Sequence, residues 1–337
     1  MSNIDEYDGQ KPLLSVRNLK KYYQVPRKGN LHAVDDVSFD IYSGETLGLV
    51  GESGCGKSTV GHTMMRLVEK TAGEMYYRDQ EVFSANNQES LALRRKIQII
   101  FQDPYSSLNP RKTIRKILSE PFIIHKLGNK EEINIEIEKL CNLVSFSKDL
   151  LNRFPHELDG GMRQVVGIAR ALSLSVDFIV CDEPVSSLDV SVQARIINLL
   201  MDLQEKMGIS YLFISHDLSV VRHISKKIAI MYLGQIVEMA PAEVIFTNAS
   251  HPYSIALLSA IPRVDQSKKQ NRIVLQGDVP SPMNPKPGCR FAPRCWMAGD
   301  DCINNNQSLT EIEPGHFVAC AYSQESQDRS KKIQLIN

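Results

Sequence analysis

The chain has 337 residues, and at roughly 150 residues per domain this predicts about two domains with a sizeable core. Lys plus Arg and Asp plus Glu number 39 each, so no global charge favours nucleic acid as a partner. No apolar run approaches the roughly 20 residues of a membrane span, and the polar, acidic stretch 1–11 is unlike a secretory signal. We therefore expect a cytosolic protein.

The first apolar stretches alternate with polar residues as half-buried strands do. Residues 14–16 and 37–41 are predicted to form strands of a small antiparallel sheet, separated by a basic loop. Tyr22 and Tyr23 follow two lysines, and an aromatic ring beside cations is suited to stack on adenine. Tandem tyrosines also serve simple packing, so this pattern leaves both roles open.

A glycine-rich loop at residues 51–58 follows the apolar run 46–50 and precedes an apolar-periodic, helical segment. Its glycines let backbone N–H groups surround a polyphosphate, Lys57 reaches the terminal phosphates, and the Ser58 hydroxyl is placed to ligate Mg²⁺. The pattern predicts a phosphate-binding P-loop. The residues expected to bind nucleotide here are Gly51, Ser53, Gly54, Cys55, Gly56, Lys57, Ser58 and Thr59.

Two buried strands end in side chains suited to a metal and to water. Strand 96–101 ends at Gln102, whose amide can touch a metal or a nucleotide-bound water. The run 178–181 reads as a buried parallel strand that delivers Asp182 and Glu183 to its carboxyl end, where open α/β sheets place ligands. Asp182 is suited to hold Mg²⁺ through water, and Glu183 to polarise an attacking water.

A further strand, predicted at 211–214, leads to His216. We expect His216 to leave the same sheet edge as Gln102 and Glu183, and this shared edge favours a contact with the γ-phosphate.

Helical patterns separate these strands. Segment 110–149 has charged faces and apolar residues at spacings of three and four, which predicts a helical insertion. Gly160 and Gly161 precede a helix predicted at 165–174 and offer a second anion-binding terminus.

In order and spacing, these motifs resemble those of ABC-transporter ATPase subunits. The matching positions are the P-loop, Gln102, segment 158–164, Asp182, Glu183, segment 187–189 and His216. Residues 101–110, 288–295 and 315–320 resemble the more specific form found in dipeptide and oligopeptide importers, closest to the F-type ATPase of their D/F pair. The resemblance covers about residues 12–322.

The resemblance implies an α/β fold: a P-loop ABC ATPase core with an antiparallel β subdomain and a helical subdomain, plus a small Cys-rich C-terminal extension. The implied ATPase domain spans 12–245, with the helical subdomain at about 104–174. The extension spans 246–322 with the four-cysteine motif, and a polar tail follows at 323–337.

The resemblance also implies residue roles. Tyr23 would stack on adenine, with Tyr22 the weaker candidate. Gln102 would sense the γ-phosphate and Mg²⁺ and link the site to the membrane subunits. Glu183 would be the general base, and His216 would steady the γ-phosphate and the attacking water. The implied Mg²⁺ ligands are Ser58, Gln102 and Asp182.

Two ATP molecules would lie between two such chains, each facing one P-loop and the partner's signature segment. The signature here is Asp159, Gly160, Gly161 and Met162, and Asp189 would contact the partner across the dimer. The family signature is Leu-Ser-Gly-Gly-Gln, so a carboxylate replaces the hydroxyl that meets the γ-phosphate. At an effective dielectric near 20 the like charges repel by several kcal/mol unless Asp159 is protonated or turned away. We therefore expect two unequal sites, of which the one built on this chain's own P-loop hydrolyses ATP.

Four of the seven cysteines lie near the end of the chain, namely Cys289, Cys295, Cys302 and Cys320. In a reducing compartment they suggest a metal rather than disulfides, and they lack the paired Cys-x-x-Cys spacing usual for structural zinc. Four thiolates in an irregular loop suit a [4Fe–4S] cluster, with which the resembling ATPases are linked. Zinc and unligated thiols remain the alternatives.

The resemblance implies an ATPase that powers import of dipeptides or oligopeptides from the cytoplasmic face of the cell membrane, bound peripherally. Its implied partners are a second ABC ATPase subunit, two transmembrane permease subunits and, indirectly, an extracytoplasmic solute-binding protein, with no nucleic acid. Import of nickel or another solute remains an alternative. A soluble ABC ATPase acting on nucleic acid or ribosomes is a weaker one, since the chain has one P-loop and no heptad run or basic excess.

Overall fold

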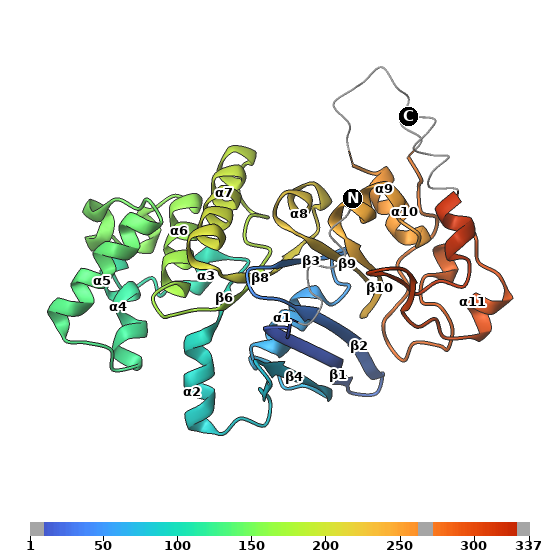
Figure 1. Cartoon of the computed structure of the whole chain (residues 1–337), viewed down its shortest axis with the longest axis horizontal. Coiled ribbons are helices and arrows are strands. Elements are labelled where there is room, and N and C mark those ends of the chain that lie inside the picture. Colours follow the sequence, from blue (N-terminus) through green and yellow to red (C-terminus); the bar gives the residue numbers. More distant parts are fainter. Residues whose placement is uncertain (1–9, 262–271, 329–337) are drawn as a thin grey trace, which may run out of the picture. The chain divides into compact units, whose positions relative to one another are not determined.

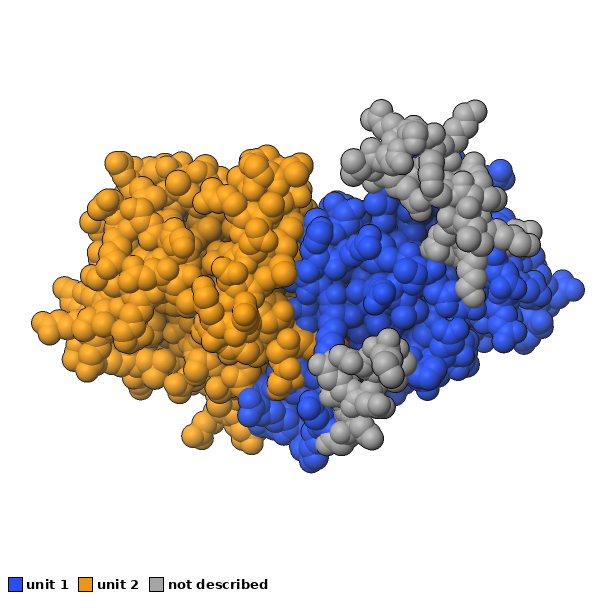
Figure 2. Space-filling model, turned by 45° about the horizontal axis from the view of Figure 1, so that its top comes forward, with its two compact units in different colours: residues 1–42, 46–83, 215–337 blue, residues 43–45, 84–214 orange. Residues whose placement is uncertain are grey.

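The computed structural model describes residues 10–261 and 272–328, whose helices and strands are labelled in Figure 1. The chain divides into two compact units, coloured separately in Figure 2. Unit 1 comprises residues 1–42, 46–83 and 215–337, and unit 2 comprises residues 43–45 and 84–214. The P-loop lies in unit 1, and Gln102, Asp182 and Glu183 lie in unit 2.

One sheet of unit 1 is antiparallel, in the order β2-β1-β4-β5. Its strands are β1 (Leu14–Val25), β2 (Gly29–Ile41), β4 (Ala72–Tyr77) and β5 (Gln80–Glu81). The strands predicted at 14–16 and 37–41 are confirmed, but both extend toward the connecting loop until Val25 pairs with Gly29. The extension was missed because charged residues break the apolar alternation in this stretch.

The other strands of unit 1 run in the order β11-β12-β10-β9-β3. They are β3 (Thr46–Val50), β9 (Lys227–Tyr232), β10 (Gln235–Pro241), β11 (Thr310–Glu313) and β12 (His316–Val318). Strand β9 pairs in parallel with β3 and antiparallel with β10, and the turn between β9 and β10 at Leu233 and Gly234 has φ values of 41° and 86°. Strand β12 pairs with β10, so part of the C-terminal region extends this sheet.

Short helices complete unit 1. They are α1 (Lys57–Met64), α8 (Leu218–Ile224), α9 (Ala242–Asn248), α10 (Pro252–Ser259), the 3-10 helix η4 (Ala292–Arg294) and α11 (Asp300–Asn304). Helix α10 begins at Pro252, directly after its cap His251. The part of the predicted polar tail beyond residue 328 falls outside the described residues.

A buried polar network joins the C-terminal strands to β10 and α10. The carboxylate of Glu238 accepts hydrogen bonds from the backbone N–H groups of Ser250, at 2.7 Å, and His251, at 3.0 Å, and lies 2.8 Å from Nε2 of His316. His251 caps α10, because its Nδ1 accepts a hydrogen bond of 3.1 Å from the backbone of Tyr253. Burial lowers the pKa of His251 to about 4, so the neutral ring that capping requires is the favoured form.

Unit 2 is built on parallel strands in the order β8-β7-β6. They are β6 (Ile97–Ile100), β7 (Phe178–Asp182) and β8 (Ser210–Ser215). Every residue of β7 and β8 is buried, as the near-continuous apolar runs predict for parallel strands covered on both faces. Each fully buried large apolar side chain contributes about 2 kcal/mol, so these strands hold their carboxyl ends in fixed positions.

Helices form the rest of unit 2, and the predicted helical insertion at 110–149 is confirmed as α4, α5 and η2. The helices are α2 (Asn87–Lys96), α3 (Pro104–Ser107), α4 (Ile114–Ile124), α5 (Lys130–Leu143), η2 (Lys148–Asn152), η3 (Pro155–Glu157), α6 (Gly160–Ala171) and α7 (Val190–Met207). The helix predicted at 165–174 begins at Gly160 instead. It starts early because Asp159 caps it, with Oδ1 accepting a hydrogen bond of 2.7 Å from the backbone of Met162. None of the helices in the described ranges is long and apolar enough to cross a membrane.

Candidate functional site

The glycine-rich loop joins β3 to α1, as the sequence predicts. Gly56 caps α1 with a φ of 109°, a left-handed conformation that side chains disfavour. A Cβ atom at Gly56 would lie 2.0 Å from the carbonyl oxygen of Ala33, and one at Gly51 would lie 2.2 Å from that of Met231. Both positions therefore have to be glycine, and the backbone of the loop is held close to its neighbours.

Lys57 places its ammonium group inside this loop. Its side chain is buried, and Nζ donates hydrogen bonds of 2.8 Å to the carbonyl of Gly51 and 3.1 Å to that of Glu52. The Cys55 thiol is also buried in the loop, and burial raises its pKa. A cation within a curled backbone at the start of a helix is arranged to attract a polyphosphate, with Ser58 in the first turn of α1.

In unit 2, Gln102 and Glu183 meet at the carboxyl ends of β6 and β7. The Gln102 Nε2 group donates a hydrogen bond of 3.0 Å to Oε2 of Glu183. Glu183 has a φ of 43°, and its backbone N–H donates to the carbonyl of Ile214, at 3.0 Å. The buried carboxylate of Asp182 ends β7 itself. The sequence prediction that Gln102 and Glu183 share a sheet edge is confirmed.

His216 directly follows β8 in the sequence and precedes α8. Asp217 caps α8 by accepting a hydrogen bond of 2.8 Å from the backbone of Ser219. The contact of His216 with a γ-phosphate remains a prediction.

The signature segment, residues 159–162, and segment 187–189 line one hollow of unit 2. Asp189 caps α7, and Oδ1 accepts hydrogen bonds of 2.6 Å from the Ser191 hydroxyl and 3.0 Å from the backbone of Val192. These hydrogen bonds lower the pKa of Asp189, so the carboxylate is charged. Gly161 packs so closely that a Cβ there would lie 2.6 Å from a methyl group of Val192.

The two tandem tyrosines have different surroundings. The Tyr22 ring stacks on His32 with 3.8 Å between ring centroids, and its hydroxyl donates to the carboxylate of Asp35. Tyr22 is therefore committed to packing within the β1-β2 hairpin. The Tyr23 ring lies 4.7 Å from the ammonium of Lys21, and Tyr23 remains the candidate for stacking on adenine.

Three of the four C-terminal cysteines have raised thiol pKa values. Burial raises the pKa of Cys320 to about 12, and charges at Cys289, Cys295 and Cys302 add to this rise. Hydrogen bonds from backbone N–H groups lower the thiol pKa of Cys289, Cys295 and Cys320 and so oppose the effect of burial. The Cys295 sulfur accepts such a hydrogen bond from the backbone N–H of Met297, at 3.4 Å. In residues 10–261 and 272–328, no group of three His, Cys, Asp or Glu side chains is placed to hold a single metal ion.

Two residues at the P-loop were not singled out from the sequence, namely Glu52 within the loop and Arg294 in the C-terminal region. Glu52 forms an ion pair with Arg294, whose Nη1 and Nη2 lie 2.8 and 3.2 Å from the two carboxylate oxygens. The sequence features that could have drawn attention to them are a glutamate inside a loop of small residues and an arginine next to Cys295. Neither signal could identify the partner, which lies 242 residues away along the chain.

Comparisons with known proteins agree with this geometry. Family models described as ABC transporter and as oligopeptide/dipeptide transporter, C-terminal region, match residues 34–186 and 237–302. The oligopeptide transport ATP-binding protein AppF of Bacillus subtilis is 48% identical over 320 residues, covering 92% of this chain and 97% of AppF. The dipeptide transport ATP-binding protein DppF of Haemophilus influenzae is 48% identical over 316 residues, covering 92% of this chain and 96% of DppF.

The fold is also similar to that of solved ATP-binding cassettes. The dimeric structure of the cassette MJ0796 bound to ADP and Pi has a TM-score of 0.62 and 27% sequence identity, covering 68% of this chain and 98% of that chain. The P-loop, the strand-end carboxylates and these likenesses place the chain in the ABC transporter family, among the ATP-binding proteins with the oligopeptide/dipeptide transporter C-terminal region.

Proposed function

We propose that this chain is the ATP-hydrolysing subunit that powers import of oligopeptides or dipeptides through an ABC transporter. The observation that carries the proposal is the built P-loop, with Lys57 buried inside it, in a chain that matches oligopeptide and dipeptide transport ATP-binding proteins over almost its whole length. The match includes the C-terminal region particular to those proteins.

In the proposed reaction, the P-loop binds the phosphates of ATP, with Lys57 neutralising them. Ser58, Gln102 and Asp182 would hold Mg²⁺, whose chemistry is to neutralise charge on the phosphate oxygens. Glu183 accepts a proton from the attacking water, and Gln102 holds its carboxylate in place. His216 is proposed to contact and steady the γ-phosphate. Tyr23 is proposed to stack on the adenine.

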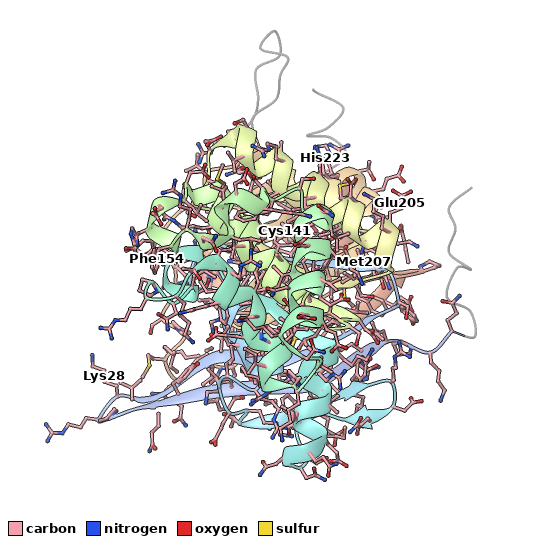
Figure 3. All side chains as sticks on the ribbon, turned by 90° about the vertical axis from the view of Figure 1, so that its left-hand side faces the viewer. Lys28, Cys141, Phe154, Glu205, Met207 and His223 are labelled. Atoms are coloured by element: carbon pink, nitrogen blue, oxygen red, sulfur yellow. The ribbon has the colours of Figure 1, made fainter. Side chains whose placement is uncertain are left out.

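The test is uptake of a labelled dipeptide by cells whose only copy of this chain carries Glu183→Gln. We expect uptake and ATP turnover to fall at least about a hundredfold, since the base is lost, while ATP binding remains. The matched control is Glu205→Gln, a change of an exposed glutamate on α7 that Figure 3 labels, and it should leave both unchanged. Uptake of nickel or another solute that depends on the chain, with peptide uptake unaffected, would contradict a peptide substrate.

We propose that the chain sits peripherally on the cytoplasmic face of the membrane, against two permease subunits served by a solute-binding protein. Support comes from apolar side chains exposed on unit 2, where Tyr105, Ile123 and Ile124 are 54%, 61% and 64% exposed. Phe154, labelled in Figure 3, is also exposed. Exposed apolar groups of this kind suit a docked helix. Ile123→Asp should abolish co-purification with the permeases and keep ATP binding, and unchanged co-purification would argue against this surface.

We further propose that the chain pairs with a second ATPase subunit and that the two ATP sites are unequal. The Asp159 carboxylate occupies the N-terminus of α6, where it accepts the backbone N–H of Met162. A phosphate bound by the partner would meet this negative charge rather than a hydroxyl. Glu183→Gln in the heterodimer should therefore remove most turnover, and the same change in the partner should remove little. The reverse result would refute the assignment.

Finally, we propose that Cys289, Cys295, Cys302 and Cys320 hold a [4Fe–4S] cluster. The backbone N–H groups at three of the sulfurs support this, because such donors stabilise ligating thiolates. The cluster would supply a structural crosslink within the C-terminal region. Zinc is the alternative metal.

A further inference from the structure

The first half of the P-loop is held by residues from the C-terminal part of unit 1. The backbone N–H of Glu52 donates a hydrogen bond of 2.9 Å to the Tyr253 hydroxyl, and the carbonyl of Glu52 accepts one of 3.1 Å from Lys57. Both oxygens of the Glu52 carboxylate accept hydrogen bonds from the guanidinium of Arg294. Glu52 is thus fixed through its N–H, its carbonyl and its side chain.

Arg294 itself is firmly held. Its side chain is 8% exposed, against 29% for Glu52, and the hydrogen bonds that it donates to the Glu52 carboxylate raise the pKa of the guanidinium still further. Nη1 also lies 3.5 Å from the Tyr232 hydroxyl. Tyr232 in turn packs against Tyr253 and Phe291, with ring centroids 4.7 and 5.2 Å apart. Because the guanidinium contacts both carboxylate oxygens and is itself held by packed aromatic side chains, the Glu52 side chain is fixed in one orientation.

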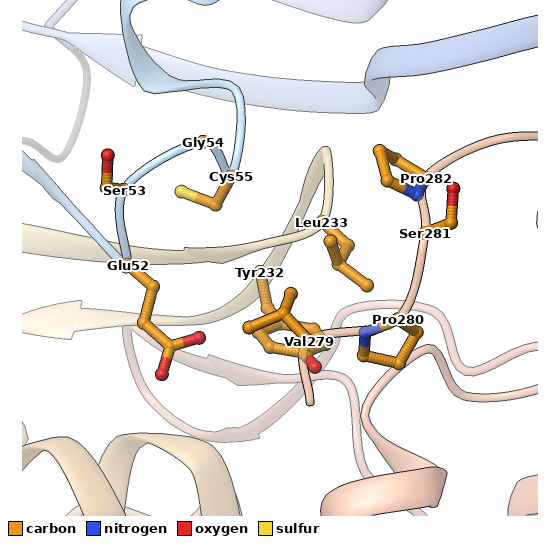
Figure 4. Close-up of a pocket in the computed structure, with 10 residues that line it drawn as sticks. All are labelled: Glu52, Ser53, Gly54, Cys55, Tyr232, Leu233, Val279, Pro280, Ser281 and Pro282. Carbon is orange, nitrogen blue, oxygen red and sulfur yellow. The ribbon is translucent and has the colours of Figure 1, made fainter. Parts of the chain in front are cut away.

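The loop also borders a hollow of about 220 Å³, shown in Figure 4. Residues 52–55 form one side of it, Tyr232 and Leu233 lie below, and segment 279–282 closes the other side. Gly56, Lys57 and Ser58 do not line this hollow, so it lies against the first half of the loop rather than at the start of α1. The first half therefore has open space on one flank and depends on Glu52 for its position.

Glu52 brings a negative charge into a loop whose ligand is a polyanion. Without a partner, its carboxylate would repel phosphates bound by the same short loop, because the Glu52 side chain is 29% exposed and therefore only partly screened by water. Arg294 cancels this charge and at the same time holds the loop.

We propose that Arg294 is a positioning residue for the phosphate-binding loop, so that the cysteine-rich region, in which Arg294 immediately precedes Cys295, forms part of the nucleotide site. The inference rests on the proposed function only in that the loop binds ATP. The ion pair gives the C-terminal region a direct mechanical and electrostatic connection to the bound phosphates, independent of which metal the cysteines hold.

The test is the dissociation constant of the full-length chain for the fluorescent analogue mant-ATP with Mg²⁺, together with kcat and KM for ATP in the assembled transporter. Arg294→Gln leaves Glu52 charged and unrestrained, so the dissociation constant and KM should rise about tenfold while kcat changes little. Glu52→Gln breaks the same pair and frees the loop but removes the repelling charge, so affinity should fall by only about threefold, less than in Arg294→Gln. The double variant should recover most of the loss.

The matched control is Arg290→Gln. Arg290 lies on the same segment, is 9% exposed on its side chain and pairs with Asp35 instead of the P-loop. It should lower the thermal midpoint about as much as Arg294→Gln and leave mant-ATP affinity unchanged. The inference is overturned if Arg294→Gln binds as the wild type does, if both single variants lose affinity equally without recovery in the double variant, or if Arg290→Gln weakens binding as much. A wild-type chain that does not bind mant-ATP would instead refute the proposed function.

Discussion

The side-chain amide of Gln102 holds the carboxylate of Glu183 through a hydrogen bond of 3.0 Å. The register of the sheet explains why the two meet. Ile100 of β6 pairs with Cys181 of β7. Gln102 lies two positions after Ile100, and Glu183 lies two positions after Cys181. The amide therefore fixes the orientation of the proposed general base before any nucleotide arrives.

Gln102→Ala should lower kcat for ATP by about tenfold or more and leave KM within about twofold, because the base loses its orientation while the P-loop is untouched. Steady-state turnover of the assembled transporter measures both constants. Gln98→Ala, in the same strand, is the control and should leave kcat unchanged. A rise in KM alone would mean that Gln102 contributes to binding and does not orient the base.

The parts of the fold that the sequence predicts well are those governed by local pattern. The P-loop between a strand and a helix and the strand ends at Gln102 and Glu183 depend on residues close together in the chain. The start of α6 was placed too late because two glycines suggest a loop, whereas the Asp159 cap and tertiary packing carry the helix through them.

The contacts that the sequence could not predict are those between distant segments. The ion pair of Glu52 with Arg294 and the burial of Glu238 against His316 join residues 242 and 78 positions apart. Periodicity and motifs carry no information on such pairs, since they depend on how the C-terminal region returns to the sheet.

Replacing Asp159 should leave ATP turnover of the heterodimer unchanged or raise it. Asp159→Ser restores the family's hydroxyl, and Asp159→Asn removes the charge while keeping a good helix cap for the Met162 N–H. If charge repulsion makes this signature inactive, both variants should behave alike. A large loss of turnover in Asp159→Asn, with the helix intact by circular dichroism, would show that the carboxylate is required.

Anaerobic purification should yield a coloured protein with about four iron atoms and four sulfides per chain and a broad absorbance near the visible range. Cys302→Ser should lose most of this iron, since the buried Cys302 is one of the four proposed ligands. Cys141→Ser, which changes a buried cysteine of α5, is the control and should keep the iron. A colourless chain with one zinc ion, or with no metal, would refute the cluster.

Acid should destabilise unit 1 through His251. Burial lowers the pKa of His251 to about 4, against 6.5 in an unfolded chain, although the nearby Glu238 favours the protonated form. Between these values the unfolded state binds more protons, so the stabilising contribution is present above pH 6.5 and is lost as the pH falls toward 4. From pH 7 to pH 5 this loss is about 2 kcal/mol of unfolding free energy. Denaturant unfolding of the wild type and of His251→Asn, which keeps a capping side chain, measures the difference. The variant should be less sensitive to acid by that amount, and equal sensitivity would show that another group is responsible.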